Sequence, residues 1–308
     1  MVGQTHETLA ADALARVVAA IDPAAVLRRT WLLSGGISSR MTVLELVGAN
    51  GQLRQLVLRQ PEGALHGDPK AAANEFHLLA HLNVVGLPTP APVILDESGE
   101  LISSPYLVVE YIDGASDLIP ANPNDAMAQL ATQLLRIHRV DCNAAALEFV
   151  PAYVPRFVHQ RDSNYPDASL GAQRIRDALA TAGPARTNNP NVLLHGDYWP
   201  GNVLWKNATI VGVIDWEEAC LGDPLTDLSI ARLDILWAFG SEAVHEFTRR
   251  YRIDSGFDMR NLPYWDLDAA LRPVFNIGEW ASTGDVTEAT MRAGHQWFVD
   301  QAFAALRG

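Results

Sequence analysis

The feature that most constrains the fold of this chain is a run of polar residues set among short β-prone segments in its second half. Residues 193–229 read LLHGDYWPGNVLWKNATIVGVIDWEEACLGDPLTDLS, and the run contains Asp197, Asn202 and Asp215. All three lie near the ends of expected short strands, and loop positions of this kind commonly carry reacting groups. A single aspartate there would only cap a turn, whereas three polar side chains at this spacing indicate a functional site.

The order and spacing of these residues match the needs of phosphoryl transfer. A kinase catalytic loop uses an aspartate to orient and deprotonate the attacking hydroxyl, an asparagine five residues later to hold magnesium, and a second aspartate for the same ions. Asp197, Asn202 and Asp215 supply that set in that order. Four intervening residues let the loop fold back, so that the Asn202 amide oxygen faces the metal while Asp197 faces the acceptor. We expect a hairpin over 203–205 and 210–214 to return Asp215 beside them.

The string HGDYWPGN followed by VIDWE resembles the signature of the aminoglycoside phosphotransferase family, within the protein-kinase-like fold. The resemblance covers most of the chain and implies an α+β, bilobal protein. Its N-terminal lobe would hold an antiparallel sheet plus a helix, and its C-terminal lobe would be mainly helical. The resemblance implies that Asp197 is the catalytic base, that Asn202 and Asp215 bind Mg²⁺, and that His195 shapes the loop by hydrogen bonding. The activity it implies is Mg²⁺-dependent transfer of the γ-phosphate of ATP or GTP to a hydroxyl of a small molecule.

The hydrophobic pattern changes character near residue 112. Between Trp31 and Tyr111, short β-rich runs alternate with turn residues, which is typical of a small antiparallel sheet, and most of the later sequence is helical in pattern. We therefore expect a nucleotide-binding lobe at 1–112 and a helical lobe with the catalytic loop and acceptor site at 113–308. The expected strands cover 42–47, 53–59, 93–96, 106–111, 203–205 and 210–214, and the expected helices cover 5–20, 69–82 after an Asp68 cap, 125–139, 170–181, 224–239, 241–251, 264–281 and 287–306.

A glycine-containing segment in the first lobe is the candidate phosphate-binding loop. Residues 33–39 read LSGGISS, and glycines beside small hydroxyl residues let backbone N–H groups approach phosphate oxygens. The segment departs from the G-x-G-x-x-G of protein kinases, so it leaves open which donors touch which phosphate. The candidate donors are Ser34, Gly35, Gly36, Ser38 and Ser39.

The next expected strand ends at Arg59, where kinases usually carry a lysine that clamps phosphates and pairs with a helix glutamate. Glu75 falls on the buried stripe of the following helix, where a charge must be paired, so Arg59 is its expected partner. A guanidinium grips a carboxylate or a phosphate with two bonds but differs from an ammonium in reach and shape, which leaves the choice of ATP or GTP open. A purely structural bridge is the alternative for this pair. By resemblance, Glu110 and Ile112, in VVEYIDG, are the candidates for backbone bonds to the purine.

Composition excludes several partner classes. The 308 residues include 23 basic and 36 acidic side chains, a net charge of −13 that repels nucleic acids and anionic membrane surfaces. The only cysteines, Cys142 and Cys220, are too few for a disulfide framework and fit a reducing compartment. The sequence has no signal-peptide pattern at its start and no apolar run near the roughly 20 residues that cross a bilayer. We expect a cytoplasmic protein with no nucleic-acid or membrane partner, and the sequence leaves the oligomeric state open.

The acceptor is expected to be a small hydroxylated molecule rather than a protein. Only eight residues separate Asp215 from Pro224, too few for an activation segment that docks a peptide, and Gly196 replaces the arginine of the protein-kinase H-R-D loop. Aminoglycosides, macrolides, choline-like amines and sugars all stay open. The aromatic spacing at Trp265, Phe275, Trp280 and Trp297 predicts core, and by resemblance Glu279 and Trp280 are candidates to face the acceptor.

Two other functions remain open from the sequence. The first is a catalytically weak or silent kinase-like protein that binds nucleotide, which Arg59 and the irregular glycine loop favour. The second is a hydrolase that uses His195 and Asp197 around a metal, although it would need more metal ligands than one loop displays.

Overall fold

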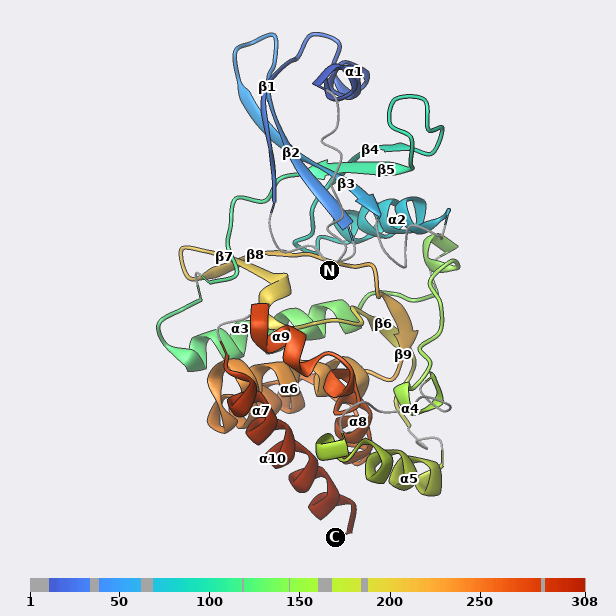
Figure 1. Cartoon of the computed structure of the whole chain (residues 1–308), viewed down its shortest axis with the longest axis vertical. Coiled ribbons are helices and arrows are strands. Elements are labelled where there is room, and N and C mark those ends of the chain that lie inside the picture. Colours follow the sequence, from blue (N-terminus) through green and yellow to red (C-terminus); the bar gives the residue numbers. More distant parts are fainter. Residues whose placement is uncertain are drawn as a thin grey trace. The chain divides into compact units, whose positions relative to one another are not determined.

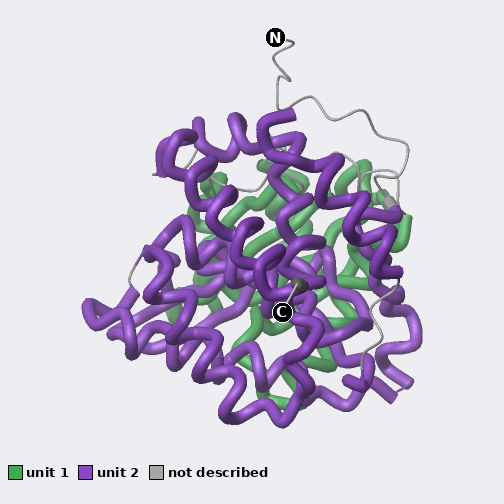
Figure 2. The backbone as a smooth tube through the Cα atoms, turned by 90° about the horizontal axis from the view of Figure 1, so that it is seen from below, with its two compact units in different colours: residues 1–113 green, residues 114–308 purple. Residues whose placement is uncertain are grey.

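The computed structural model describes residues 11–33, 39–61, 69–117, 119–143, 145–159, 168–183, 188–283 and 286–307. The chain divides into two compact units, unit 1 at Met1–Asp113 and unit 2 at Gly114–Gly308 (Figure 2). Over the described ranges, no helix combines the length and the apolar character needed to cross a bilayer.

Unit 1 contains a five-stranded antiparallel sheet in the order β1-β2-β3-β5-β4 (Figure 1). The four strands predicted from the sequence are present, and their ends lie within three residues of the predicted ones. The elements are α1 at Ala11–Ile21, β1 at Val26–Leu32, β2 at Ser39–Val47, β3 at Leu53–Pro61, α2 at Ala71–Val84, β4 at Pro92–Asp96 and β5 at Tyr106–Glu110.

The edge strand β1 was not predicted from the sequence, because none of its side chains is buried and its middle carries charge. Arg28 and Arg29 of this strand bind the carboxylate of Glu45 in β2, at 3.3 and 2.8 Å. Charged side chains on an edge strand are a common protection against pairing with another chain. The strand is therefore specified by its pairing with β2 rather than by an apolar pattern of its own.

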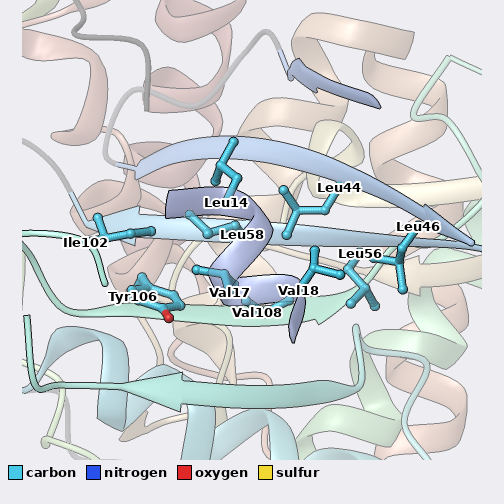
Figure 3. Close-up of a cluster of buried hydrophobic side chains, with 10 residues drawn as sticks. All are labelled: Leu14, Val17, Val18, Leu44, Leu46, Leu56, Leu58, Ile102, Tyr106 and Val108. Atoms are coloured by element: carbon cyan, nitrogen blue, oxygen red, sulfur yellow. The ribbon is translucent and has the colours of Figure 1, made fainter. Parts of the chain in front are cut away.

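The core of unit 1 lies between α1 and one face of the sheet (Figure 3). Alternate residues of a strand point to the same face, so Leu56 and Leu58 of β3 meet Val17 of α1 on one side. Arg59 is out of phase with Leu58 and belongs to the opposite face, where it pairs with Glu75 of α2. The two helices of this unit thus serve different faces: α1 covers the apolar core and α2 carries the partner of a buried charge.

The start of α2 differs from the prediction. The helix begins at Ala71 with Lys70 in the capping position and no side-chain cap, so Pro69 precedes the helix instead of occupying its first turn. The predicted cap, Asp68, lies outside the described residues.

Unit 2 is mainly helical, with two small two-stranded sheets, β6 with β9 and β7 with β8 (Figure 1). The predicted hairpin is present as β7 and β8, whereas the three-residue strands β6 and β9 were too short to be recognised. The helices and strands are α3 at Pro123–His138, α4 at Arg156–His159, α5 at Ala172–Ala182, β6 at Val192–Leu194, β7 at Val203–Lys206, β8 at Thr209–Val213, β9 at Cys220–Gly222, α6 at Leu225–Phe239, α7 at Ser241–Ser255, α8 at Leu262–Ala269, α9 at Ile277–Thr283 and α10 at Glu288–Arg307. The short 3₁₀ turns are η2 at Ala145–Leu147, η3 at Ala168–Leu170, η4 at Pro200–Asn202 and η5 at Arg272–Val274.

The single helix predicted over 264–281 is wrong. The segment is divided into α8, the turn η5 and α9, and Pro273 lies in the turn. Proline lacks the backbone N–H that continues a helix and clashes with the preceding turn, which accounts for the break. Phe275, directly after η5, is 41 % exposed rather than in the core. Trp297 of α10 is 36 % exposed, again contrary to the prediction, whereas Trp265 is buried as predicted.

Candidate active site

A buried carboxylate on α6 holds the backbone of the candidate catalytic loop. Asp227 is fully buried and accepts hydrogen bonds from the backbone N–H groups of His195 and Gly196, at 2.6 and 2.9 Å. The ring of His138 on α3 lies 3.3 Å from the same carboxylate. Burial would raise the pKa of Asp227, but the hydrogen bond of His138 and the proximity of His138 and His195 lower it below its ordinary value. An ionised carboxylate at this point ties the loop to α6 and α3.

Position 196 of this loop must be glycine. Gly196 has a φ of +84°, a left-handed conformation that L side chains rarely adopt, and a Cβ there would lie 2.1 Å from the backbone oxygen of Glu218. This close approach is a physical reason for the absence of an arginine at the position where protein kinases carry one. The loop passes directly against the segment that follows Asp215.

Both ring nitrogens of His195 are used to shape the loop. Its Nδ1 accepts the backbone N–H of Asp197 at 3.3 Å, so Nε2 carries the proton that is donated to the backbone oxygen of Ile214 at 3.0 Å. The ring is fully buried and packs against Trp216 with 4.5 Å between ring centroids. This geometry favours a shaping role for His195 over the metal-hydrolase role.

Asp197, Asn202 and Asp215 are brought together by the hydrogen bonds of Asn202. Its Nδ2 donates to the backbone oxygen of Asp197 at 3.0 Å and to Asp197 Oδ2 at 3.2 Å. Its backbone oxygen accepts the N–H of Ile214 at 2.9 Å, which places the neighbouring Asp215 beside the loop. Asp215 has a φ of +66°, a left-handed backbone conformation that non-glycine residues rarely adopt.

Turn η4 makes the short path from Asp197 to Asn202 possible. A Cβ on Gly201 would lie 2.1 Å from the indole ring of Trp199, so a larger residue there would require this side chain to move. The Trp199 side chain is nevertheless 41 % exposed. The loop therefore presents an aromatic surface two residues from Asp197.

The residues of this site fit a magnesium ion through Asn202 and Asp215. The described contacts of the Asn202 side chain use its Nδ2 donor, which leaves its Oδ1 as an oxygen ligand. No cluster of three or more His, Cys, Asp or Glu side chains suited to a metal occurs within the described ranges. Mg²⁺ is typically bound by one or two carboxylates together with substrate phosphates and water, so a small donor set agrees with its chemistry.

A partly buried arginine that contacts Asp197 was not foreseen from the sequence. Arg272 of η5 forms an ion pair with Asp197 and a second one with Asp234 of α6 at 2.6 Å. Burial would lower the pKa of Arg272, but Asp234 and Asp197 raise it above its ordinary value. Burial also raises the pKa of Asp234, which Arg272 partly offsets. The only sequence signal for this arrangement was Pro273, which interrupts the helical pattern immediately after Arg272.

The candidate nucleotide residues of unit 1 are only partly described. Ser34, Gly35, Gly36 and Ser38 lie outside the described residues, and Ser39 is a buried residue at the start of β2. The predicted ion pair is present, with Arg59 Nη1 3.1 Å from Glu75 Oε1 and both side chains buried.

The two hinge candidates differ in their backbone bonding. The backbone N–H of Glu110 donates to Ala91 at 2.8 Å, and its side chain pairs with Arg54. Ile112 follows β5, and neither its N–H nor its carbonyl bonds another described residue. Ile112 thus retains the backbone groups that a purine would need, whereas the Glu110 N–H is already used.

Comparison with known proteins adds an independent line of information. Residues 31–265 match the model of the phosphotransferase enzyme family. The chain is 29% identical to mouse (Mus musculus) acyl-CoA dehydrogenase family member 10 over 234 residues, and 27% identical to the homoserine kinase of Polaromonas naphthalenivorans (strain CJ2) over 198 residues. The first match covers 66% of this chain and 22% of the relative; the second covers 56% and 61%. The chain therefore spans only part of the length of these relatives.

Among solved structures, the GDP and kanamycin complex of APH(2″)-IIIa is similar over nearly the whole chain. The match has a TM-score of 0.65 at 17% identity and covers 94% of this chain and 97% of the other. At this identity the likeness shows the fold alone, which is the protein-kinase-like fold predicted from the sequence. Taken with the family match over residues 31–265, these findings show that the chain belongs to the phosphotransferase enzyme family.

Proposed function

We propose that the chain is a small-molecule kinase that transfers the γ-phosphate of ATP or GTP to a hydroxyl group. The observation that carries this proposal is the hydrogen bonding of Asn202, which joins Asp197, Asn202 and the segment of Asp215 into one constellation. Three oxygen-bearing side chains in this order are the minimum that a kinase catalytic loop needs. If these polar residues only capped separate turns, the hydrogen bonds that join Asn202 to Asp197 and to Ile214 would not be needed.

In this proposal Asp197 positions the acceptor hydroxyl and receives its proton. One carboxylate oxygen of Asp197 is bonded to Asn202 and the other is paired with Arg272, so the side chain is oriented from two sides. Phosphoryl transfer leaves little covalent chemistry to the protein and depends on alignment and charge neutralisation. A fixed carboxylate is suited to that task.

Asn202 and Asp215 would hold Mg²⁺, which supplies charge neutralisation on the phosphates when it is bound. Arg59, fixed by Glu75, would contact the phosphates of the donor, and Ile112 would offer its backbone groups to the purine. The APH(2″)-IIIa structure contains GDP, which supports a purine nucleotide as donor and keeps GTP beside ATP as a candidate.

The acceptor is proposed to be a soluble, hydroxylated small molecule. Kanamycin in one structural neighbour and homoserine in the name of one relative are both small hydroxylated amines, although they differ in size and charge. The fold alone does not select between them, because acceptor recognition depends on residues of the site rather than on the architecture.

The direct test is release of nucleoside diphosphate from Mg-ATP and Mg-GTP in the presence of alcohols, sugars, amino alcohols, aminoglycosides and macrolides. We expect at least one acceptor to stimulate release above the rate in water. The Asp197→Asn variant keeps the size of the side chain and should lower the stimulated rate by about a hundredfold or more, while nucleotide still raises the melting temperature. Full activity in Asp197→Asn would contradict the assignment of the base.

A catalytically weak nucleotide-binding protein is the second candidate. The observation that favours it is the ion pair between Arg272 and Asp197, because it occupies a carboxylate oxygen that a base would use. This function predicts that ATP or GTP raises the melting temperature but that no acceptor in the panel increases its consumption. An Arg272→Gln variant that gains activity would support a silenced site.

A further inference from the structure

A cavity of about 390 Å³ in unit 2 lies among α6, α7, α8 and α10 and shares no lining residue with the catalytic loop. Its volume falls within the range of small-molecule sites, which run from about 300 to 1,000 Å³. The phosphotransferase activity proposed above assigns it no role. A ligand of this cavity would therefore be separate from the donor and the acceptor of that reaction.

The lining of the cavity is basic in a chain whose net charge is −13. Four arginines line it, and the only acidic side chain among the lining residues is Asp266. The arginines are Arg232, Arg249, Arg252 and Arg260. Guanidinium groups gathered at one cavity offer donors that suit an anionic ligand, although Arg232, Arg249 and Arg260 are each paired with a carboxylate.

The arginines at the rim are not all neutralised by neighbouring acids. Arg249 pairs with Glu246 at 2.7 Å and Arg260 with Asp258 at 2.5 Å. Arg252 is exposed, and no carboxylate of the described residues forms an ion pair with it. It therefore leaves a surplus positive charge at the mouth of the cavity.

The positions of two of these arginines slightly destabilise helix α7. Arg249 and Arg252 are three residues apart, a spacing that puts them on the same face, where like charges oppose helix formation by a few tenths of a kcal/mol. The end of the helix dipole favours Arg252 and offsets part of this cost. Arg249 is itself paired with Glu246, so the surplus positive charge on this face of the helix comes from Arg252.

The floor of the cavity is a rigid, buried guanidinium. Arg232 is 5 % exposed and binds both carboxylate oxygens of Asp266 at 3.0 Å, while its third bond goes to Thr248. A guanidinium has five N–H groups, so two remain beyond these three bonds. The side chain is already held in place by its partners, and little conformational entropy is lost when it binds a ligand.

We propose that this cavity is a binding site for a small polyanion that carries phosphate or carboxylate groups. The planar forks of the arginines match either oxyanion, and at least two anionic groups are needed to engage the rim and the floor together. The surplus charge at Arg252 provides attraction at the mouth, and Arg232 provides fixed donors below it.

The test is isothermal titration calorimetry of the purified chain with pyrophosphate and with citrate at low ionic strength, in buffer stripped of divalent cations with a chelating resin. Without divalent cations, pyrophosphate has no metal to hold it beside Asp197 and Asp215, and no soluble chelator competes for the cavity. We expect one saturable site for at least one probe, and the tighter probe identifies the chemistry of the ligand. The Arg252→Gln variant should bind about tenfold more weakly or worse, because one charge-assisted contact is lost.

The matched control is Arg292→Gln on α10, which removes a partly exposed arginine of the same unit that does not line the cavity. It should bind the probes as the unmodified chain does. A second variant, Arg260→Gln, removes a rim charge from a different segment and should also weaken binding. Melting curves establish that each variant is folded. The proposal fails if neither probe binds saturably, or if Arg252→Gln and Arg292→Gln bind with equal affinity.

Discussion

Each unit contains an arginine that is largely shielded from solvent and paired with carboxylates, and only the ion pair of Arg59 was predicted from the sequence. Arg59 in unit 1 pairs with Glu75, which lies 16 residues further along the chain. Arg272 in unit 2 pairs with Asp197, 75 residues earlier, and with Asp234, 38 residues earlier. The first pair joins a strand to the helix that follows it, whereas the second joins a turn to a distant loop and a distant helix. The comparison shows that the separation of the partners along the chain, not their burial, decides whether an ion pair can be predicted from a local sequence pattern.

The largest loss of stability is expected when the ion pairs of Arg272 in unit 2 are removed. Arg272→Met removes the cation from two acidic partners that are partly shielded from water and should lower the free energy of unfolding by about 4 kcal/mol, because unpaired charges in such surroundings are costly. Seven of the eight tryptophans lie in unit 2, so tryptophan fluorescence in urea follows this unit. Arg292→Gln is the control and should leave the midpoint unchanged. An equal midpoint for Arg272→Met would mean that its two ion pairs contribute nothing to stability.

A smaller loss is expected for Arg59→Met in unit 1. This change leaves Glu75 buried without its guanidinium and should cost about 3 kcal/mol, measured by circular dichroism in urea. The exposed Arg28→Gln in β1 is the control, since Arg29 still holds Glu45. If Arg59→Met shifted the tryptophan transition as strongly as Arg272→Met does, the two ion pairs would not act on separate units.

The third prediction concerns pH and the anchor of the catalytic loop. Asp227 has a lowered pKa in the folded state, so its contribution to stability is present above the ordinary carboxyl value of 3.8 and is lost as the pH falls through the lowered value. The urea midpoint of unit 2 should therefore fall between pH 5 and pH 3. In Asp227→Asn the midpoint should be lower at pH 5 and should vary less over this interval. An equally steep dependence in that variant would show that other carboxylates control the acid response.

The smallest effect is expected for Arg59→Lys. Lysine keeps the charge beside Glu75 but offers no planar fork, so the free energy of unfolding should change by less than about 1 kcal/mol. Under the proposed function, the change should act instead on KM for ATP or GTP, with little effect on KM for the acceptor. A change confined to the acceptor would contradict the placement of Arg59 near the donor phosphates.

The catalytic loop was predictable because its information is local. Asp197, Asn202 and Asp215 lie within 19 residues, and the hairpin between them is specified by its own strand pattern. The paired strands of unit 1 were predictable for the same reason, since each has an alternating or continuous apolar pattern. The structure adds the hydrogen bonds that join these residues, while their chemical roles remain a proposal.

The elements that were missed lack local information. β1 has no buried side chain, and β6 and β9 are three residues long, so their pairing is decided by distant neighbours. The break at Pro273 was overlooked because apolar residues continue at helical spacing on both sides of it. Arg272 could not be assigned to the site from sequence, because a 3₁₀ turn and two remote carboxylates determine where its guanidinium lies.

The helix α6 is buried along nearly its whole length and carries three charged residues with separate tasks. Asp227 holds the catalytic loop, Arg232 forms the floor of the basic cavity, and Asp234 holds Arg272. Each added residue would rotate the rest of an α-helix by about 100° and advance it by about 1.5 Å. A single insertion after Asp227 would therefore turn Arg232 and Asp234 away from their partners at once. The loops of this fold can change in length as acceptor specificity evolves, but the number of residues between Asp227, Arg232 and Asp234 in α6 has to stay the same.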